Sequence, residues 1–322
     1  MQGFSRGHLT LGCCLSLIGT ATQAQPAPTT TSVENTARTI YNSGSANYDV
    51  PTNTLSIQVD ELIDVGLTSL AAANAVISND PTAIPFAVVN TGRGPEAFII
   101  RVNPEIGSGR FTPSIDSIMI DTNGNGLAEP GIDRVIANGG VTPEMEPGQQ
   151  IQVFVIASLP PEAVDRAAGT FSVMATAATG SGNPGAVIAS AGTSGTDAII
   201  GRSGAQQASA ASLVAALATV TTAKSSTIVD PLGGTRAVSG SRITFQLAAT
   251  ATGSGSARGV RLVDAIPIGT TYVAGSMTID GRKLSDIDDS DAGSFTANSV
   301  NVALGTVNGG ERRVVGFSVI IK

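Results

Sequence analysis

Oxygen-bearing side chains alternate with glycines in the stretch DTNGNGLAEPGID, residues 121–133. Calcium prefers hard oxygen ligands, and calcium loops place them at alternate positions around a glycine that allows a sharp bend. The stretch has this pattern from its first residue, with Gly126 at the bend. The predicted ligands are Asp121, Asn123, Asn125, Leu127 through its backbone carbonyl, Glu129 and Asp133. We therefore predict that this loop holds a structural calcium ion.

Ile132 excludes the standard helix-loop-helix cage, because it occupies the closing position where that cage has a bidentate glutamate. The alternative is a pair of Asn-Gly turns without an ion. Hairpin loops usually span two to five residues, and a longer bare loop with three carboxylates would repel itself. The length of the loop therefore favours an ion, bound with the weak affinity of extracellular calcium sites.

The chemistry available elsewhere is limited by where the histidine and the cysteines lie. His8, Cys13 and Cys14 are the only ones in the chain. All three fall in residues 1–24, where an arginine, an apolar run and small residues together predict a secretory signal peptide. The apolar run is shorter than the roughly 20 residues of a membrane-spanning helix. The mature chain would then have no histidine, cysteine or tryptophan, which excludes Ser-His-Asp and Cys-His catalysis and imidazole or thiolate metal sites.

Carboxylate pairs offer little for glycoside hydrolysis. Asp60 and Glu61 are adjacent on an expected strand and so point to opposite faces. Glu144 and Glu146 lie in a proline-containing turn, and aromatic residues make up only 4% of the chain. A further acidic run, SDIDDSDAG, contains Asp286 and is expected to be a solvated loop, with a shared ion as the alternative. We predict no enzymatic activity.

Composition and periodicity indicate an exported all-β protein. The charged fraction is 13% and the formal net charge is −7, which disfavours nucleic acid as a partner. Short runs with alternating apolar residues, such as QQIQVFVIA and RITFQLAATATG, are separated by turn signals. Hairpins are expected around Asp280-Gly281 and around Asn308-Gly309-Gly310. The predicted fold class is all-β, with two immunoglobulin-like β-sandwich domains in tandem after a cleaved signal peptide.

The predicted domain boundaries follow the changes in composition along the chain. The expected segments are a signal peptide at 1–24, a flexible N-terminus at 25–36, a first β-sandwich at 37–180, a Gly/Ala/Ser-rich connection at 181–212 and a second β-sandwich at 213–322.

The C-terminal part resembles the bacterial conserved-repeat domain, catalogued as domain of unknown function number eleven, over about residues 220–322. The resemblance rests on Asp264, Ile266, Pro267, Gly269, Thr270, Tyr272, Val273, Gly275, Ser276, Leu304, Gly305, Val307 and Gly310. It departs from the family where ATATGSGSA replaces an Asn-Thr-Gly turn. The resemblance implies an immunoglobulin-like sandwich on a bacterial surface or secreted protein, without catalysis. Tyr272 is then expected to be structural.

Some surface sandwiches contain a Lys-to-Asn isopeptide crosslink, for which Lys224 is the candidate lysine here. The final strand, RVVGFSVIIK, offers no asparagine or aspartate as a partner, so Lys224 is expected to be a surface lysine.

The sequence thus predicts a secreted or cell-surface bacterial protein, with the periplasm as an alternative location. The first functional hypothesis is a structural or surface-assembly and adhesion protein whose partners are other copies of itself or cell-envelope components. Exposed sheet edges would allow such assembly by β-augmentation. The second hypothesis is a calcium-dependent extracellular binding module for a carbohydrate or protein ligand. No nucleic-acid partner and no transmembrane segment are expected.

Overall fold

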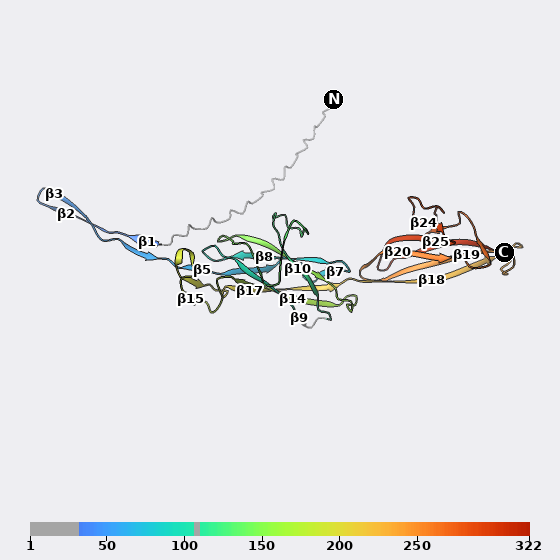
Figure 1. Cartoon of the computed structure of the whole chain (residues 1–322), viewed down its shortest axis with the longest axis horizontal. Helices are drawn as coiled ribbons and strands as arrows, with labels where there is room; N and C mark the ends of the chain where they lie inside the picture. The colour runs from blue at the N-terminus through green and yellow to red at the C-terminus, as the bar shows by residue number, and fades with distance from the viewer. Residues whose placement is uncertain (1–31, 106–109) are drawn as a thin grey trace, which may run out of the picture.

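The computed structural model describes residues 32–105 and 110–322, and the predicted signal peptide lies outside these residues. The described residues contain no α-helix and only one 3-10 turn, at Thr193–Gly195. The predicted all-β class is therefore confirmed. Three parts follow one another along the chain, namely a two-stranded arm, a first sandwich and a second sandwich (Figure 1).

The arm is a long antiparallel hairpin formed by residues 32–58. Its strands are β1 (Ser32–Asn35), β2 (Arg38–Ser43), β3 (Ala46–Pro51) and β4 (Leu55–Gln58). Strand β1 pairs with β4 and β2 pairs with β3, and the turn between β2 and β3 contains Gly44 at φ 61°. Every residue of the four strands is exposed. The arm therefore differs from the sequence prediction, which places a flexible N-terminus at 25–36 and starts the first sandwich at residue 37.

The first sandwich contains two five-stranded sheets, with strand orders β11-β10-β13-β8-β6 and β12-β9-β14-β17-β7. A small third sheet, β15-β16-β5, extends one end. The strands are β5 (Glu61–Ile63), β6 (Val65–Ser69), β7 (Ala75–Ile77), β8 (Thr82–Asn90), β9 (Phe98–Glu105), β10 (Ser114–Ile120), β11 (Arg134–Ile136), β12 (Gly140–Val141), β13 (Gln150–Ser158), β14 (Ala168–Ala177), β15 (Val187–Ile188), β16 (Ala198–Ile200) and β17 (Gln206–Ala215).

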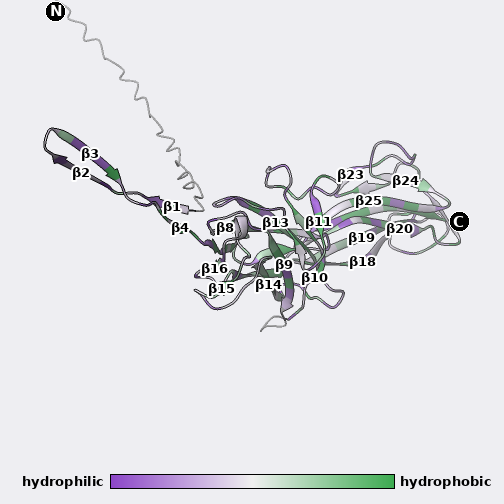
Figure 2. Ribbon diagram, turned by 60° about the vertical axis from the view of Figure 1, so that its left-hand side comes forward, coloured by the Kyte–Doolittle hydropathy of each residue, from purple (hydrophilic) through white to green (hydrophobic). Residues whose placement is uncertain are grey.

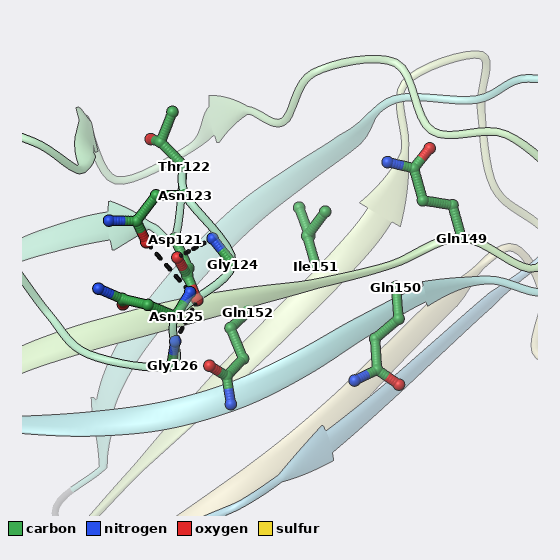
Figure 3. Close-up of a pocket in the computed structure, with 10 residues that line it drawn as sticks. All are labelled: Asp121, Thr122, Asn123, Gly124, Asn125, Gly126, Gln149, Gln150, Ile151 and Gln152. Atoms are coloured by element: carbon green, nitrogen blue, oxygen red, sulfur yellow. Dashed lines mark hydrogen bonds between the residues drawn. The ribbon is translucent and has the colours of Figure 1, made fainter. Parts of the chain in front are cut away.

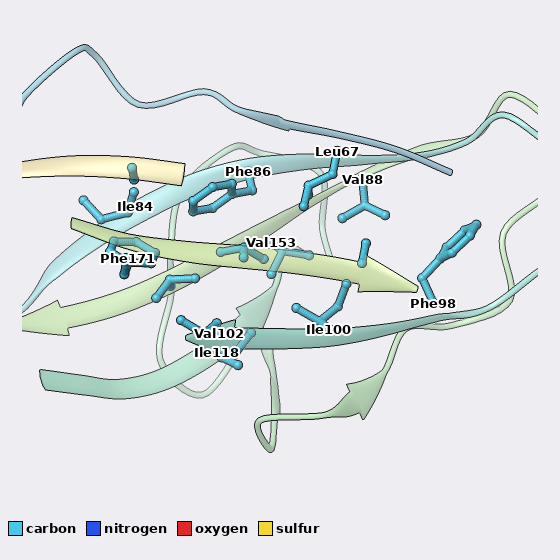
Figure 4. Packing of buried hydrophobic residues seen from close by; sticks show 14 of the residues in the cluster. Leu67, Ile84, Phe86, Val88, Phe98, Ile100, Val102, Ile118, Val153 and Phe171 are labelled. Atoms are coloured by element: carbon cyan, nitrogen blue, oxygen red, sulfur yellow. The ribbon is translucent and has the colours of Figure 1, made fainter. Parts of the chain in front are cut away.

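Apolar side chains from both sheets fill the space between them (Figure 4). Along β14, every second residue is buried, as expected for a strand with one face on a core. Phe171 on β14 meets Phe86 on β8 edge to face, with ring centroids 5.9 Å apart. Both rings are fully buried. The first sandwich is thus stabilised by one continuous core.

Strand β17 lies where the sequence suggested a connecting segment at 181–212. It pairs with β14 over nine residues and with β7 on its other side, and Ala211, Leu213 and Ala215 enter the core. Its alanine-rich and serine-rich sequence has weak strand propensity, so the local pattern predicts at most an edge strand within a connection and not a central strand of the first sandwich. The first sandwich therefore extends to Ala215.

The second sandwich packs one sheet, β18-β19-β26-β22-β23, against the three-stranded sheet β20-β25-β24, while β21 also pairs with β26. The strands are β18 (Ala218–Val229), β19 (Arg242–Gly253), β20 (Ser256–Ala265), β21 (Thr270–Tyr272), β22 (Thr278–Ile279), β23 (Arg282–Lys283), β24 (Gly293–Thr296), β25 (Ser299–Asn308) and β26 (Arg312–Ile321). A separate core, centred on the buried Phe317, holds the two sheets together. Strands β25 and β26 belong to different sheets, so the expected hairpin at Asn308-Gly309-Gly310 is a connection between layers.

Only Ala216 and Leu217 separate β17 from β18. The Asp165 carboxylate spans this junction, because it accepts hydrogen bonds from Leu217 N at 2.9 Å and from Ser254 N at 3.0 Å.

None of the helices described here has the length and apolarity to cross a bilayer.

Candidate functional site

The predicted calcium loop connects β10 to β11, and four of its six predicted ligands lie together. The two carboxylate oxygens of Asp121 accept the N–H groups of Gly124 at 2.7 Å and Gly126 at 2.8 Å. The side-chain amides of Asn123 and Asn125 both donate to Glu129 Oε2, at 2.9 and 2.5 Å. The alternating polar residues and glycines thus fold the loop around Asp121 (Figure 3), and the two asparagine amides reach Glu129.

The other two predicted ligands have different surroundings. Asp133 is only 5% exposed, and its carboxylate accepts the N–H groups of Thr122 at 3.1 Å and Glu129 at 2.8 Å. It therefore fastens the two ends of the loop together. The side chain of Leu127 is exposed, and its N–H donates to Asn125 Oδ1 at 2.9 Å.

This hydrogen bonding closes the loop through its own groups. The amide oxygens of Asn123 and Asn125 accept N–H groups two residues further along the chain, and their amide nitrogens face Glu129. A cation between Asp121 and Glu129 would need both amides to turn their oxygens toward it. In the described part of the chain, no three carboxylate, histidine or cysteine side chains are placed to hold one metal ion. The calcium site thus stays a prediction.

An open hollow of about 580 Å³ lies between this loop and the start of β13. Its walls are the loop from Asp121 to Gly126 and the segment from Gln149 to Gln152 (Figure 3). Three glutamine side chains and one carboxylate give it both hydrogen-bond donors and acceptors. This lining suits a neutral polar ligand and offers no nucleophile or general base pair.

A second hollow, of about 400 Å³, brings together Glu61, Glu96 and Glu144. Sequence reasoning missed this set, because the three residues come from distant segments and no motif connects them. Glu61 accepts a hydrogen bond from the Thr193 hydroxyl at 2.6 Å. No aromatic residue lines the hollow, so it lacks the flat surface on which a sugar ring would stack.

Glu96 is the buried member of this set, at 4% exposure. Its Oε1 accepts the N–H of Ala97 at 2.9 Å, whereas Oε2 is buried without a hydrogen-bond partner among the described residues. Burial raises the pKa of the Glu96 carboxyl, and the negative charge of Glu61 raises it further. The carboxyl therefore takes up a proton more readily than an exposed glutamate.

Exposed apolar residues lie in both parts of the arm. Directly paired residues of an antiparallel ribbon point to the same face. Tyr41 pairs with Tyr48 and their rings stack at 4.9 Å, while Val33 pairs with Ile57. Seven large apolar residues of the arm are exposed, as the hydrophobic segments of this ribbon in Figure 2 illustrate. Ile40, at 74% exposure, pairs with Asp49. The other six are between 42% and 59% exposed, namely Val33, Tyr41, Tyr48, Val50, Leu55 and Ile57. These six side chains are here called the arm apolar set.

Lys224 has a partner that the sequence did not suggest. Its Nζ lies 2.5 Å from Asp264 Oδ2 on β20 and 4.6 Å from the ring centroid of Phe245. The lysine thus ties the edge strand β18 to the opposite sheet, instead of lying free on the surface.

Tyr272 and the acidic run also have structural contacts. The Tyr272 hydroxyl donates to Asp286 Oδ1 at 2.6 Å, and its ring stacks on Phe295 with centroids 4.2 Å apart. Burial, followed by the hydrogen bond to Asp286, raises the pKa of Tyr272 to about 12. Asp291 accepts N–H groups from Ser285 and Gly293, so part of the run folds on itself.

Comparisons with known proteins leave the family open. No family model and no curated protein match the chain. The resemblance of residues 220–322 to the conserved-repeat domain therefore stays a prediction.

Solved structures give only weak matches. The C-terminal domain of the Streptococcus agalactiae AgI/II polypeptide BspA has a TM-score of 0.33 at 9% identity, covering 80% of this chain and 92% of its own. A putative membrane anchored protein from Corynebacterium diphtheriae has a TM-score of 0.22 at 8% identity, covering 90% and 88%. The collagen binding domain of the Erysipelothrix rhusiopathiae surface protein RspB has a TM-score of 0.19 at 13% identity, covering 82% and 83%. Scores this low carry no conclusion about function.

Proposed function

We propose that this chain is a non-catalytic structural or adhesive protein of the bacterial surface or its surroundings. The observation that carries the proposal is the arm, whose apolar side chains are exposed on a ribbon that projects from the body (Figure 1). Exposed apolar surface of this kind marks a site of interaction with another macromolecule. The two sandwiches behind it present the arm at one end of the chain.

The chemistry of the two hollows supports the same conclusion. One is lined by amides and one carboxylate, and the other by three glutamates without an aromatic neighbour. Neither hollow is lined by a histidine, a cysteine or an aromatic residue. The protein would therefore act through its surfaces, with other copies of itself or cell-envelope components as partners.

Fractionation of cells that express the protein tests this function. Labelling with an antibody against the second sandwich, viewed by electron microscopy, should place the protein on the cell surface or in extracellular material. A protein found only as free monomer in the culture fluid or in the periplasm, without attachment to any structure, would contradict the proposal.

A second candidate is a calcium-dependent extracellular binding module. The feature in its favour is the convergence of Asp121, Asn123, Asn125 and Glu129 in one loop beside a polar hollow. A bound calcium ion would supply positive charge to this loop, and the hollow would take a carbohydrate or protein ligand. Calorimetry of the metal-stripped protein should then show heat on adding millimolar calcium, and Glu129→Gln should abolish it. No heat and no shift in melting temperature would remove this candidate.

A further inference from the structure

We infer that the arm of one copy adds to the free edge of strand β18 in a second copy, so that the chains join head to tail. The inference rests on the proposed structural function and names the partner and the two contacting elements. Three observations support it: the arm has only two strands, the edge of β18 is long and unprotected, and the two elements lie at opposite ends of the structure.

Within the described residues, the arm has no ladder partner outside itself. Its ladder hydrogen bonds connect only β1 with β4 and β2 with β3. An isolated two-stranded hairpin is at best marginally stable in water, and it gains stability when a further strand or an apolar surface covers one face. The arm apolar set provides exposed apolar surface, and the two legs provide free backbone edges.

Strand β18 is the one long unprotected edge among the described sheets. Natural sheets protect their edges by short strands, bulges, prolines or charges. The edge strands of the first sandwich have between two and five residues. Strand β20 has ten residues, but its register shifts beside Val260 and it carries two arginines. Strand β18 has twelve residues, pairs with β19 without a shift, and carries only one charge, Lys224.

The two edges match in length and chemistry. The first leg of the arm runs from Ser32 to Ser43, which is twelve residues, the same as β18. At about 3.3 Å per residue, both edges extend for roughly 40 Å. The residues of β18 are mainly threonine, serine and alanine, and its one charged residue, Lys224, is bound to Asp264. The first leg of the arm adds Glu34, which is exposed, and Arg38, which is bound to Asp49.

The area available suits a weak contact. Each member of the arm apolar set leaves about half of its side chain exposed. At roughly 80 Å² each, the six side chains carry about 500 Å² of apolar surface. Edge pairing covers only part of this surface besides the backbone edge, so the contact is smaller than the roughly 800 Å² per partner of standard interfaces, and assembly should depend on concentration.

The arm and β18 lie too far apart in one chain to touch each other, so the contact must form between two copies. The arm lies at one end of the elongated structure and the second sandwich at the other, with the first sandwich between them (Figure 1). The arm therefore cannot reach β18 of its own chain. A contact between unlike surfaces on two copies repeats without closing and produces a linear assembly.

Sedimentation velocity on the full secreted protein, over a range of concentrations, tests the inference with three variants. The arm variant combines Tyr48→Lys with Val50→Lys, and the edge variant combines Thr221→Lys with Ser225→Lys. The control Ile287→Lys places the same charge at another exposed apolar residue. The unmodified protein and the control should form assemblies that grow with concentration, whereas the arm and edge variants should each remain monomeric.

Mixing the two defective variants distinguishes head-to-tail contact from any symmetric contact. An intact edge in the arm variant can accept the intact arm of the edge variant, so an equimolar mixture should form dimers and nothing larger. A monomeric unmodified protein at high concentration would overturn the inference, even if the protein is attached to cells as proposed above. Assembly by the arm variant, or by the edge variant alone, would overturn it as well. Unchanged melting temperatures would show that both variants are folded.

Discussion

Removing the Asp165 carboxylate should loosen the junction between the two sandwiches. This side chain accepts hydrogen bonds from Leu217 N at 2.9 Å, from Ser254 N at 3.0 Å and from the Ser254 hydroxyl at 2.5 Å. A hydrogen bond to a charged group contributes about 1.5–3 kcal/mol when well buried. Because the Asp165 side chain is 27% exposed, we take about 1 kcal/mol for each bond, or about 2–3 kcal/mol in total.

Hydrogen exchange measures this loss directly. In Asp165→Ala, the amides of Leu217 and Ser254 should exchange roughly 30- to 150-fold faster, since each 1.4 kcal/mol is about a factor of ten. Amides inside the first core, such as that of Val153, should keep their protection. Unchanged exchange at Leu217 and Ser254 would refute the view that this carboxylate holds the junction.

The same junction should respond to acid. The Ser254 hydroxyl, and then the Leu217 N–H, hold the pKa of Asp165 below its usual value of 3.8. A carboxyl with a lowered folded pKa contributes its stability above the unfolded pKa and loses it as the pH falls through the folded pKa. Protection of the two amides should therefore be constant from neutral pH down to about pH 4 and should decline below it. In Asp165→Ala this acid-dependent step should be absent.

Three other substitutions test buried polar groups. Glu96→Gln should raise the melting temperature at neutral pH by about 2–4 °C, because it removes a buried charge whose Oε2 has no partner among the described residues. Its advantage should shrink as the pH falls toward the raised pKa of Glu96, where the unmodified carboxyl takes up its proton. Tyr272→Phe should lower the unfolding free energy by about 1 kcal/mol by removing the bond to Asp286. It should also remove the loss of stability above pH 10 that follows from a folded pKa of about 12. Lys224→Met should cost about 1–2 kcal/mol in chemical denaturation by leaving Asp264 unpaired, and the additional change Asp264→Asn should recover most of it.

Local patterns in the sequence predicted the parts of the fold that depend on neighbouring residues. The hairpin at Asp280-Gly281 joins β22 to β23, and both residues have positive φ, at 49° and 79°. This is the backbone conformation that a two-residue Asp-Gly turn favours. The alternation in residues 150–158 likewise predicted a strand with one buried face, which is β13. In each case the signal lies within a few residues.

Pairing between distant segments determined the parts that the sequence did not reveal. Strand β1 pairs with β4 some twenty residues later, and β17 is stabilised by β14 rather than by its own propensity. The three glutamates of the second hollow come from separate loops and strands, so no spacing connects them. The predicted calcium loop, by contrast, is local, and four of its six residues do converge. Turns, strand patterns and the local folding of this loop were therefore predictable from the sequence, whereas the pairing of distant strands and the convergence of distant residues were not.

The two sandwiches and the arm differ in what stabilises them, and this difference bears on function. Each sandwich buries a continuous apolar core, whereas no arm residue is buried. Fixing each residue of a backbone costs about 1–2 kcal/mol, and a stacked aromatic pair and an exposed ion pair each return about 1 kcal/mol or less. The Tyr41–Tyr48 stack and the Arg38–Asp49 ion pair are the arm's main side-chain contacts, so they offset only part of this cost. The remaining stabilisation comes from outside the arm, and among the described residues the long unprotected edge of β18 in a second copy is the surface that we propose for it.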